Sequence, residues 1–227
     1  MIYAKQRILN RLLELLPKRS KKTLKRIPGA RRLVRALGVR QDYIKHRLFL
    51  LEMLPKYSVG AEIGVNLGNF AEQILQIVRP AELHLIDPWK YETAAIYKGA
   101  VYGGRAEEGQ EQMDKRHAGV VSRFEKEIGA HSVIVHRGES ANVLKGFPDD
   151  YFDWVYIDGN HLYEYVIMDL KVSARKTKIG GYITGDDYVD GGWWKGSVKK
   201  AVDEFTKTGP IQLVQVRNGQ FILRRIE

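Results

Sequence analysis

From residue 58 onward, short apolar runs alternate with amphipathic stretches. The apolar runs have the length of β-strands and lie at residues 58–63, 82–86, 132–136, 152–157 and 180–184. The amphipathic stretches have the 3.6-residue period of helices and lie around residues 69–78, 107–128, 161–175 and 196–207. Strands that alternate with helices predict an α/β fold, in which helices cover both faces of a parallel sheet.

The end of the chain shows a different pattern. Two strand-like runs, residues 211–216 and 221–225, flank the dipeptide Asn218-Gly219. Asn-Gly between such runs favours a tight turn that joins antiparallel strands. The sequence therefore predicts a mostly parallel, seven-stranded sheet with a C-terminal antiparallel hairpin.

The first 48 residues carry the excess of positive charge. They hold 15 Lys and Arg against Glu14 and Asp42, whereas residues 49–227 hold 22 Lys and Arg and 25 Asp and Glu. The first part therefore has a net charge of +13 and the rest −3. The spacing of apolar residues predicts helices at residues 3–16, after residue 29, and at residues 43–54. We expect a basic helical extension at residues 1–48 and a folded α/β domain at residues 49–227.

Two roles fit this basic extension. Basic helices with apolar stripes bind the surface of anionic membranes. The same stripes also suit docking on the α/β domain or on a partner subunit, in a homo-oligomer for example.

Several whole-chain features bear on location. The chain has no cysteine, which excludes disulfides, thiolate zinc sites and cysteine nucleophiles and fits a reducing cytoplasm. It has no apolar run near the ~20 residues of a membrane span, and its start lacks the pattern of a signal peptide. We expect a cytoplasmic protein, peripheral to the membrane if the extension binds lipid.

A glycine-containing turn follows the first predicted strand, where residues 62–68 read EIGVNLG. Glycines at a strand-to-helix turn let a ligand approach the backbone closely. A dinucleotide fingerprint would need glycine where Asn66 and Asn69 stand, so the pattern is instead E-x-G-x-x-x-G. The second strand ends in Asp87, an acid placed to accept hydrogen bonds from both hydroxyls of a ribose.

Acidic residues follow the fourth and fifth predicted strands. Asp158 comes after one strand, and Asp186 and Asp187 come after the other. Neighbouring strands lie about 4.8 Å apart, so three carboxylates are expected close together, where they would repel one another. A bound divalent cation removes that repulsion, and an all-oxygen ligand set suits Mg²⁺, Mn²⁺ or Ca²⁺. His161, three residues after Asp158, is placed to accept a proton, to ligate the metal or only to pack.

The sequence resembles class I S-adenosylmethionine-dependent methyltransferases, which have a Rossmann-like fold. The E-x-G-x-x-x-G turn is similar to their first motif, and a terminal antiparallel hairpin is typical of them rather than of dehydrogenases. The motifs D-G-x-H-x-Y-E-x-x-x-x-D-L at residues 158–170 and G-D-D-Y at residues 185–188 resemble the metal-dependent macrolide and aminocoumarin sugar O-methyltransferases. The resemblance covers about residues 58–225 and implies that the domain at residues 49–227 is the catalytic domain.

This resemblance implies a function and a set of site residues. The implied function is transfer of a methyl group from S-adenosylmethionine to a hydroxyl of a small molecule or sugar, assisted by Mg²⁺ or Mn²⁺. The implied metal ligands are Asp158, Asp186 and Asp187, and the implied catalytic residues are His161 and Asp158. The implied cofactor-binding residues are Glu62, Gly64, Asn66, Gly68, Asp87, Glu139, Ser140 and Asp158.

Aromatic residues mark two candidate walls of an acceptor site. One lies in the long insertion at residues 88–106 and the other directly after the acidic pair, and long loops at a ligand edge often act as lids. The aromatic residues are Trp89, Tyr91, Tyr97, Tyr102, Trp193 and Trp194.

The acceptor itself has two candidate classes. The alternative to a small molecule or glycan is nucleic acid, with the basic extension binding phosphate groups. The N-P-P-[YF] motif of base-methylating enzymes is absent after the fourth strand, where Asp158-Gly159-Asn160-His161 stands. This absence favours the small-molecule or glycan acceptor.

Overall fold

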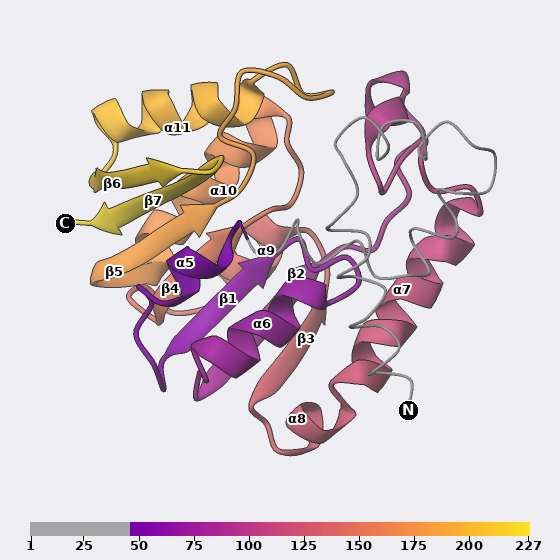
Figure 1. Cartoon of the computed structure of the whole chain (residues 1–227), viewed down its shortest axis with the longest axis horizontal. Helices are drawn as coiled ribbons and strands as arrows, with labels where there is room; N and C mark the ends of the chain where they lie inside the picture. Colours follow the sequence, from indigo (N-terminus) through magenta and orange to yellow (C-terminus); the bar gives the residue numbers. More distant parts are fainter. Residues whose placement is uncertain (1–45) are drawn as a thin grey trace, which may run out of the picture. The chain divides into compact units, whose positions relative to one another are not determined.

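Seven strands form one sheet in the computed structural model, which describes residues 46–227. The strands are β1 (Val59–Ile63), β2 (Glu82–Asp87), β3 (Val133–Arg137), β4 (Phe152–Ile157), β5 (Thr177–Gly185), β6 (Ile211–Arg217) and β7 (Gln220–Arg225). Their order across the sheet is β3-β2-β1-β4-β5-β7-β6. Strands β1 to β5 pair in parallel, and β7 is antiparallel to both β5 and β6. The predicted sheet, with its terminal hairpin, is confirmed (Figure 1).

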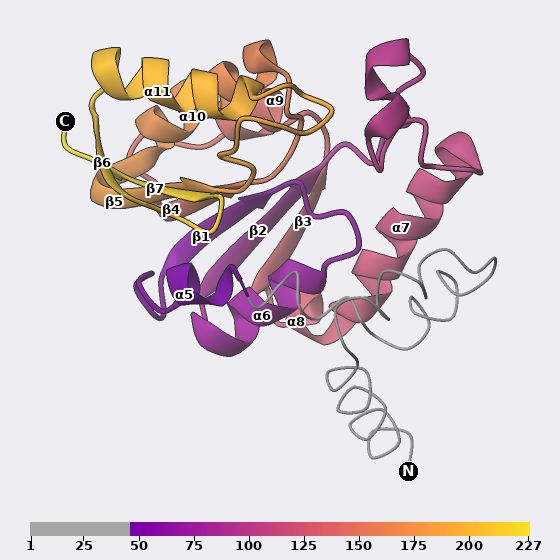
Figure 2. The ribbon, with the colours of Figure 1, turned by 45° about the horizontal axis from the view of Figure 1, so that its top comes forward.

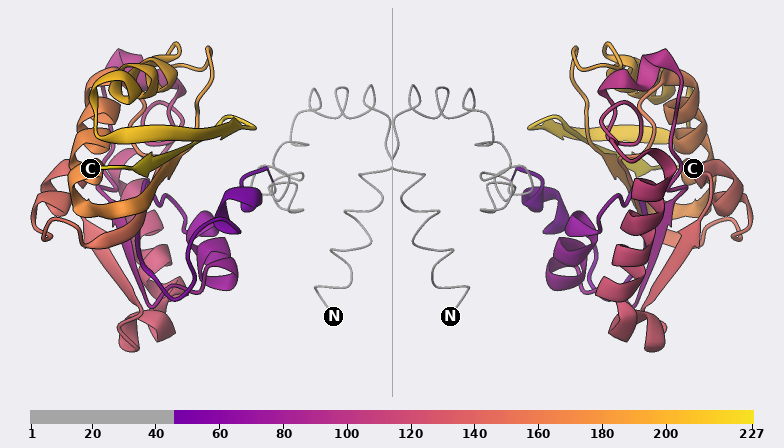
Figure 3. Two further views of the ribbon diagram at one scale, coloured as in Figure 1. Left: turned by 90° about the vertical axis from the view of Figure 1, so that its left-hand side faces the viewer. Right: turned by 90° about the vertical axis from the view of Figure 1, so that its right-hand side faces the viewer.

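Helices cover both faces of the sheet. They are α5 (Leu48–Leu51), α6 (Asn69–Ile77), the 3₁₀ helix η1 (Ala95–Gly99), α7 (Gly109–Arg123), α8 (Glu125–Gly129), α9 (Ser140–Lys145), α10 (Tyr163–Lys176) and α11 (Ser197–Thr208). Helices α9, α10 and α11 lie on one face, and α6 and α8 lie on the other (Figure 2, Figure 3). This is the layered arrangement that the alternating pattern predicts.

The central strand β4 shows why the sheet is buried on both faces. Its residues are buried except Asp153, as expected for a parallel strand that is covered by helices on either side. The ring of Trp154 lies against Gly60 on β1, where a side-chain carbon would come within 2.1 Å of the indole. The absence of a side chain at Gly60 thus makes room for the largest side chain on β4.

Three elements differ from their predicted bounds by three residues or more. The predicted helix at residues 107–128 is two helices, because Phe124 leaves the helical conformation between α7 and α8. The ring of Phe124 packs into the space at Gly68, 2.8 Å from where a side-chain carbon would stand. The predicted helix at residues 43–54 is confined, within the described residues, to α5, which ends at Leu51. Strand β5 begins three residues earlier than predicted.

Residues 49–227 form one compact unit. Within the described part of the chain, no helix combines the length and the apolar character that a membrane crossing requires. The helices predicted at residues 3–16 and after residue 29 lie outside the described residues.

Candidate active site

The carboxyl ends of four parallel strands meet at one edge of the sheet. Ile63 at the end of β1 pairs with Ile86 on β2 and with Ile157 on β4, and Ile157 pairs with the last residue of β5. The strand ends are therefore level. The predicted site residues that follow them lie at residues 64–68, 87, 158 and 186–187, so the sheet brings these segments to one edge, as the strand order predicts.

The turn between β1 and α6 depends on its glycines. Gly64 has a φ of 87° and Gly68 a φ of 72°, in the left-handed region that favours glycine. A side chain on Gly64 would place its first carbon 2.0 Å from the carbonyl oxygen of Asp158. The turn and the end of β4 therefore border the same space. Glu62, two residues before the turn, is buried within β1.

Asp87 ties the end of β2 to this turn. Its Oδ2 accepts a hydrogen bond from the backbone N–H of Asn66 at 2.9 Å, and its Oδ1 accepts one from the N–H of Trp89 at 2.7 Å. Burial raises the pKa of Asp87, and these backbone donors oppose the rise. Asp87 therefore lies beside the turn at residues 64–68, the predicted cofactor turn, and it also fixes the shape of that turn.

Trp89 has a different place from the predicted one. Its side chain is 1% exposed, and its Nε1 donates a hydrogen bond to the carbonyl oxygen of Asn66 at 2.9 Å. The ring packs beside His117 on α7. Trp89 therefore packs between the turn at residues 64–68 and α7, and it does not form a wall for an acceptor. Tyr91 is likewise turned toward the start of α7, where its ring lies 3.7 Å from the side-chain position of Gly109.

Glu139 and Ser140 lie at the start of α9, after β3. Glu139 is exposed, and the hydroxyl of Ser140 donates a hydrogen bond to Oδ1 of Asp169 at 2.5 Å. Asp169, on α10, is 3% exposed, and burial raises its pKa to about 7 against the opposing hydrogen bond from Ser140. The sequence analysis missed this contact. One sequence feature could have revealed it: Asp169 lies on the same helical face as the buried residues Val166 and Leu170, where an acidic residue needs a partner.

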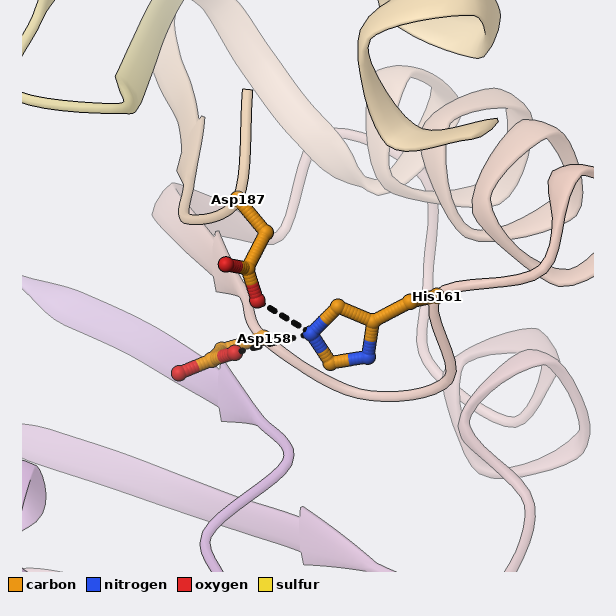
Figure 4. Close-up of side chains that lie close together, drawn as sticks. All are labelled: Asp158, His161 and Asp187. Carbon is orange, nitrogen blue, oxygen red and sulfur yellow. Dashed lines mark hydrogen bonds and ion pairs between the residues drawn. The ribbon is translucent and has the colours of Figure 1, made fainter. Parts of the chain in front are cut away.

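Asp158, His161 and Asp187 form the group that the structure brings closest together (Figure 4). One ligand atom of each lies within 4.8 Å of the others. Nε2 of His161 donates a hydrogen bond to Oδ2 of Asp187, because an ionised carboxylate can only accept, and it lies 3.6 Å from Oδ1 of Asp158. Burial lowers the pKa of His161, but the carboxylates of Asp187 and Asp158 outweigh burial and hold it above its ordinary value.

Asp186 stands apart from this group of ligand atoms. Its side chain is 7% exposed, and its Oδ1 accepts a hydrogen bond from Nε2 of Gln220 at the start of β7. Gln220 in turn accepts a hydrogen bond from the hydroxyl of Tyr156, 3.2 Å away. The arrangement thus differs from the predicted ligand set of three aspartates, because the hairpin holds one of them. No pattern within one strand could reveal this contact, since 34 positions separate its partners.

Aromatic side chains gather beside His161. Trp194 lies with its ring centre 4.7 Å from the imidazole, and Trp193 lies 5.7 Å away. Trp193 also contacts the rings of Tyr97 and Tyr102, from the insertion after β2. The two predicted walls therefore meet, and four of the six predicted aromatic residues lie on them.

Several buried polar atoms at this place have no hydrogen-bond partner among the described residues. They include Nδ1 of His161 and Nε1 of Trp194. A buried polar atom without a partner is costly unless a ligand or water supplies one. The aromatic walls thus carry buried polar atoms that are available to a ligand next to the acidic group.

Comparison with known families gives one match. The family described as "Methyltransferase domain" matches residues 61–188, more than half of the chain. This range runs from β1 to the residue after the acidic pair, and so contains every predicted site residue. No curated protein sequence matches the chain.

Solved methyltransferase structures share the fold. The O-methyltransferase NovP is 20% identical, covers 80% of each chain and has a TM-score of 0.55. The O-methyltransferase TomG from Streptomyces achromogenes is 16% identical over 82% of this chain and 80% of its own, with a TM-score of 0.53. A putative rRNA-methylase from Clostridium thermocellum is 15% identical over 81% of this chain and 96% of its own, with a TM-score of 0.55. At these identities the likeness is one of fold.

Proposed function

The chain belongs to the methyltransferase-domain family, and from this premise we propose that it transfers a methyl group from S-adenosylmethionine to a hydroxyl of a small molecule or sugar, with the help of a divalent cation. The observation that carries the proposal is the group of Asp158, His161 and Asp187 beside the glycine turn. Two carboxylates and an imidazole in contact suit both the binding of a divalent cation and the transfer of a proton.

The residues around the turn fit the cofactor. The glycines let a ligand approach the backbone closely. Asp87, which lies beside this turn at the end of β2, is the proposed acceptor for the ribose hydroxyls. Glu139 and Ser140 lie at the start of α9, after the next strand, and are the proposed contacts of the adenine. S-adenosylmethionine supplies an activated methyl group, so the chain's task is to align a sufficiently nucleophilic oxygen with it.

The acidic group fits Mg²⁺ or Mn²⁺. Asp158 and Asp187 offer carboxylate oxygens, which these cations prefer, and Nε2 of His161 lies among them. Asp186 lies outside this set of ligand atoms, and its Oδ1 is bonded to Gln220. When bound there, a divalent cation supplies Lewis-acid activation and a template for two neighbouring oxygens of the acceptor.

His161 has a second task in this proposal, which is to accept the proton of the attacking hydroxyl. A sugar hydroxyl is a weak acid, so a base at this point contributes about 10²–10⁴-fold to turnover. The unpartnered Nδ1 of His161 and Nε1 of Trp194 are placed to bind the acceptor's oxygens. Replacement of His161 by Ala should then lower kcat more than it changes the acceptor KM.

The test is turnover on vicinal-diol acceptors, a panel of monosaccharides and catechols, first with EDTA and then with added Mg²⁺. Activity should vanish in EDTA and return with Mg²⁺. Asp187→Asn should be inactive but should bind S-adenosylhomocysteine as tightly as the wild type does. Asp190→Asn is the matched control, because Asp190 is three residues away, 86% exposed and bonded to Lys199. Full activity in EDTA together with an active Asp187→Asn would refute metal assistance.

The alternative acceptor is nucleic acid, for which the +13 charge of residues 1–48 is the supporting observation. The same assay with RNA and DNA oligonucleotides separates the two acceptors. Methylation of an oligonucleotide, falling steeply as salt is raised, would favour nucleic acid over a small hydroxylated molecule.

A further inference from the structure

Helix α7 contacts both the cofactor turn and the insertion after β2 through one side chain. Nη1 of Arg116 donates a hydrogen bond to Oδ1 of Asn66 at 3.1 Å and another to the carbonyl oxygen of Val101 at 2.9 Å. The two acceptors lie 50 and 15 positions from Arg116 in the chain. A single nitrogen with two hydrogens therefore joins two separate loops.

At one end of this link, the cofactor turn is held in a single shape. Asn66 has a φ of 54°, an uncommon conformation for a residue with a side chain. Its N–H donates a hydrogen bond to Asp87, and its carbonyl oxygen accepts one from Trp89. Its side chain is the third group that can hold the turn in place, and Arg116 binds that side chain.

At the other end lies a segment that we call the cover, residues 94–106. It begins with η1, and a side chain on Gly99 would come within 2.9 Å of Trp193, so the cover packs closely on the loop after β5. The hydroxyl of Tyr97 accepts a hydrogen bond from Nδ2 of Asn160 at 2.9 Å. Asn160 belongs to the turn between Asp158 and His161, so the cover is tied to the acidic group as well.

We propose that Arg116 is a positioning residue that couples the cofactor turn to the cover, so that cofactor binding orders the acceptor side of the site. The coupling rests on the proposed function, since it assumes that the turn binds S-adenosylmethionine. A planar guanidinium that shares two acceptors cannot follow one loop without straining its bond to the other. By linkage, an acceptor that orders the cover strengthens cofactor binding by the same factor.

Helix α7 also supplies a matched control. Arg123 lies seven residues after Arg116 and likewise donates from Nη1 to an asparagine, Oδ1 of Asn69, at 2.9 Å. That bond goes to α6, outside both the turn and the cover. Arg123→Met thus removes the same charge and an Arg–Asn bond from the same helix.

The experiment measures backbone hydrogen exchange of the full chain with and without S-adenosylhomocysteine, which stands in for the cofactor. In the wild type and in Arg123→Met, the ligand should slow exchange within the cover. In Arg116→Met the ligand should no longer slow it, and ligand affinity should fall about 5- to 100-fold, the range of typical couplings. Arg116→Lys, which keeps the charge and two donors, should restore part of both effects.

A double-mutant cycle tests the link from its other end. Asn66→Gly removes the acceptor without straining a positive φ, and its effect on ligand affinity should not add to that of Arg116→Met. If Arg116→Met keeps the ligand-induced slowing in the cover, or if the two substitutions simply add, the coupling is overturned. Failure of the wild type to bind S-adenosylhomocysteine would overturn the proposed function and the coupling together, whereas binding without coupling overturns the coupling alone.

Discussion

At the scale of single residues, Asp87 would combine two tasks under the proposed function, fixing a turn and binding a ribose. Its carboxylate accepts two backbone N–H groups, one from the cofactor turn and one from the insertion that follows β2. Each oxygen of a carboxylate has two acceptor sites. The same side chain can therefore fix the turn and still accept hydrogen bonds from a ribose.

Asp87→Ala should weaken binding of S-adenosylmethionine by about 1–3 kcal/mol, because it removes the ribose acceptor and leaves backbone donors without a partner. Isothermal titration calorimetry measures the change. Glu72→Gln, which alters an exposed carboxylate on α6, is the control and should bind normally. Unchanged affinity in Asp87→Ala would exclude Asp87 from the cofactor site.

Asp169 predicts a dependence of stability on pH. Its pKa is raised from 3.8 to about 7 in the folded protein, so the folded state holds a proton that the unfolded state releases. The stabilisation is therefore complete below pH 3.8 and is lost as the pH rises through 7, by about 4 kcal/mol in all. Asp169→Asn, which cannot ionise, should lose less stability than the wild type between pH 5 and pH 8.

Urea unfolding at these two pH values measures that difference. Glu164→Gln, an exposed site on the same helix, should behave as the wild type does. Parallel pH profiles for Asp169→Asn and the wild type would show that Asp169 is already ionised in the folded state.

The sequence shows which residues stand at the strand ends, but it does not show which side chains they bind or pack against. The positions of Asp87, Asp158 and Asp187 follow from the order of the strands alone. The hydrogen bond between Asp186 and Gln220 depends on the pairing of β7 with β5. The burial of Trp89 depends on its packing against α7. Side-chain direction is decided by tertiary contacts that no local pattern contains.

At the scale of elements, two glycines differ in whether their positions tolerate a side chain. Gly64 has a positive φ and lies against the backbone of Asp158, whereas Gly119, within α7, has nothing within 4 Å of its side-chain position. Gly64→Ala should therefore lower the free energy of unfolding by about 1–3 kcal/mol or more from backbone strain alone. Gly119→Ala should raise it by about 0.5–1 kcal/mol, because alanine favours the helix.

Thermal denaturation of both variants distinguishes these effects, since equal shifts in the same direction would contradict the described turn.

The elements that the sequence predicts well are those with a long, regular period. The break at Phe124 has no local signal of Gly or Pro; it arises because the ring packs at Gly68, more than 50 positions earlier. Likewise, η1 lies in an insertion without helical periodicity.

At the scale of the whole molecule, the charge is divided between two parts of the chain. Residues 1–48 carry +13 and residues 49–227 carry −3. If the extension binds membranes, the full chain should bind vesicles that contain anionic lipid, and added salt should weaken this binding, because basic segments gain about 1 kcal/mol per Lys or Arg near such a surface. Replacing Lys18, Arg19, Lys21 and Lys22 by Gln should then weaken co-sedimentation with the vesicles.

Neutral vesicles are the control for that experiment and should bind neither protein. Removal of residues 1–45 provides the second measurement. A preserved melting temperature would agree with a surface-binding role, and a large drop would show that the extension instead docks on a folded partner, within the chain or in another subunit.

Strand β7 lies between β5 and β6, although it follows both in the chain. Until β7 pairs with it, β5 is the open edge of the parallel sheet, with unpaired backbone groups along one side. A folding intermediate without the hairpin therefore exposes an edge strand next to the acidic loop, and such an edge can pair with another chain. Pairing of the last strand is thus the step that protects this edge from aggregation.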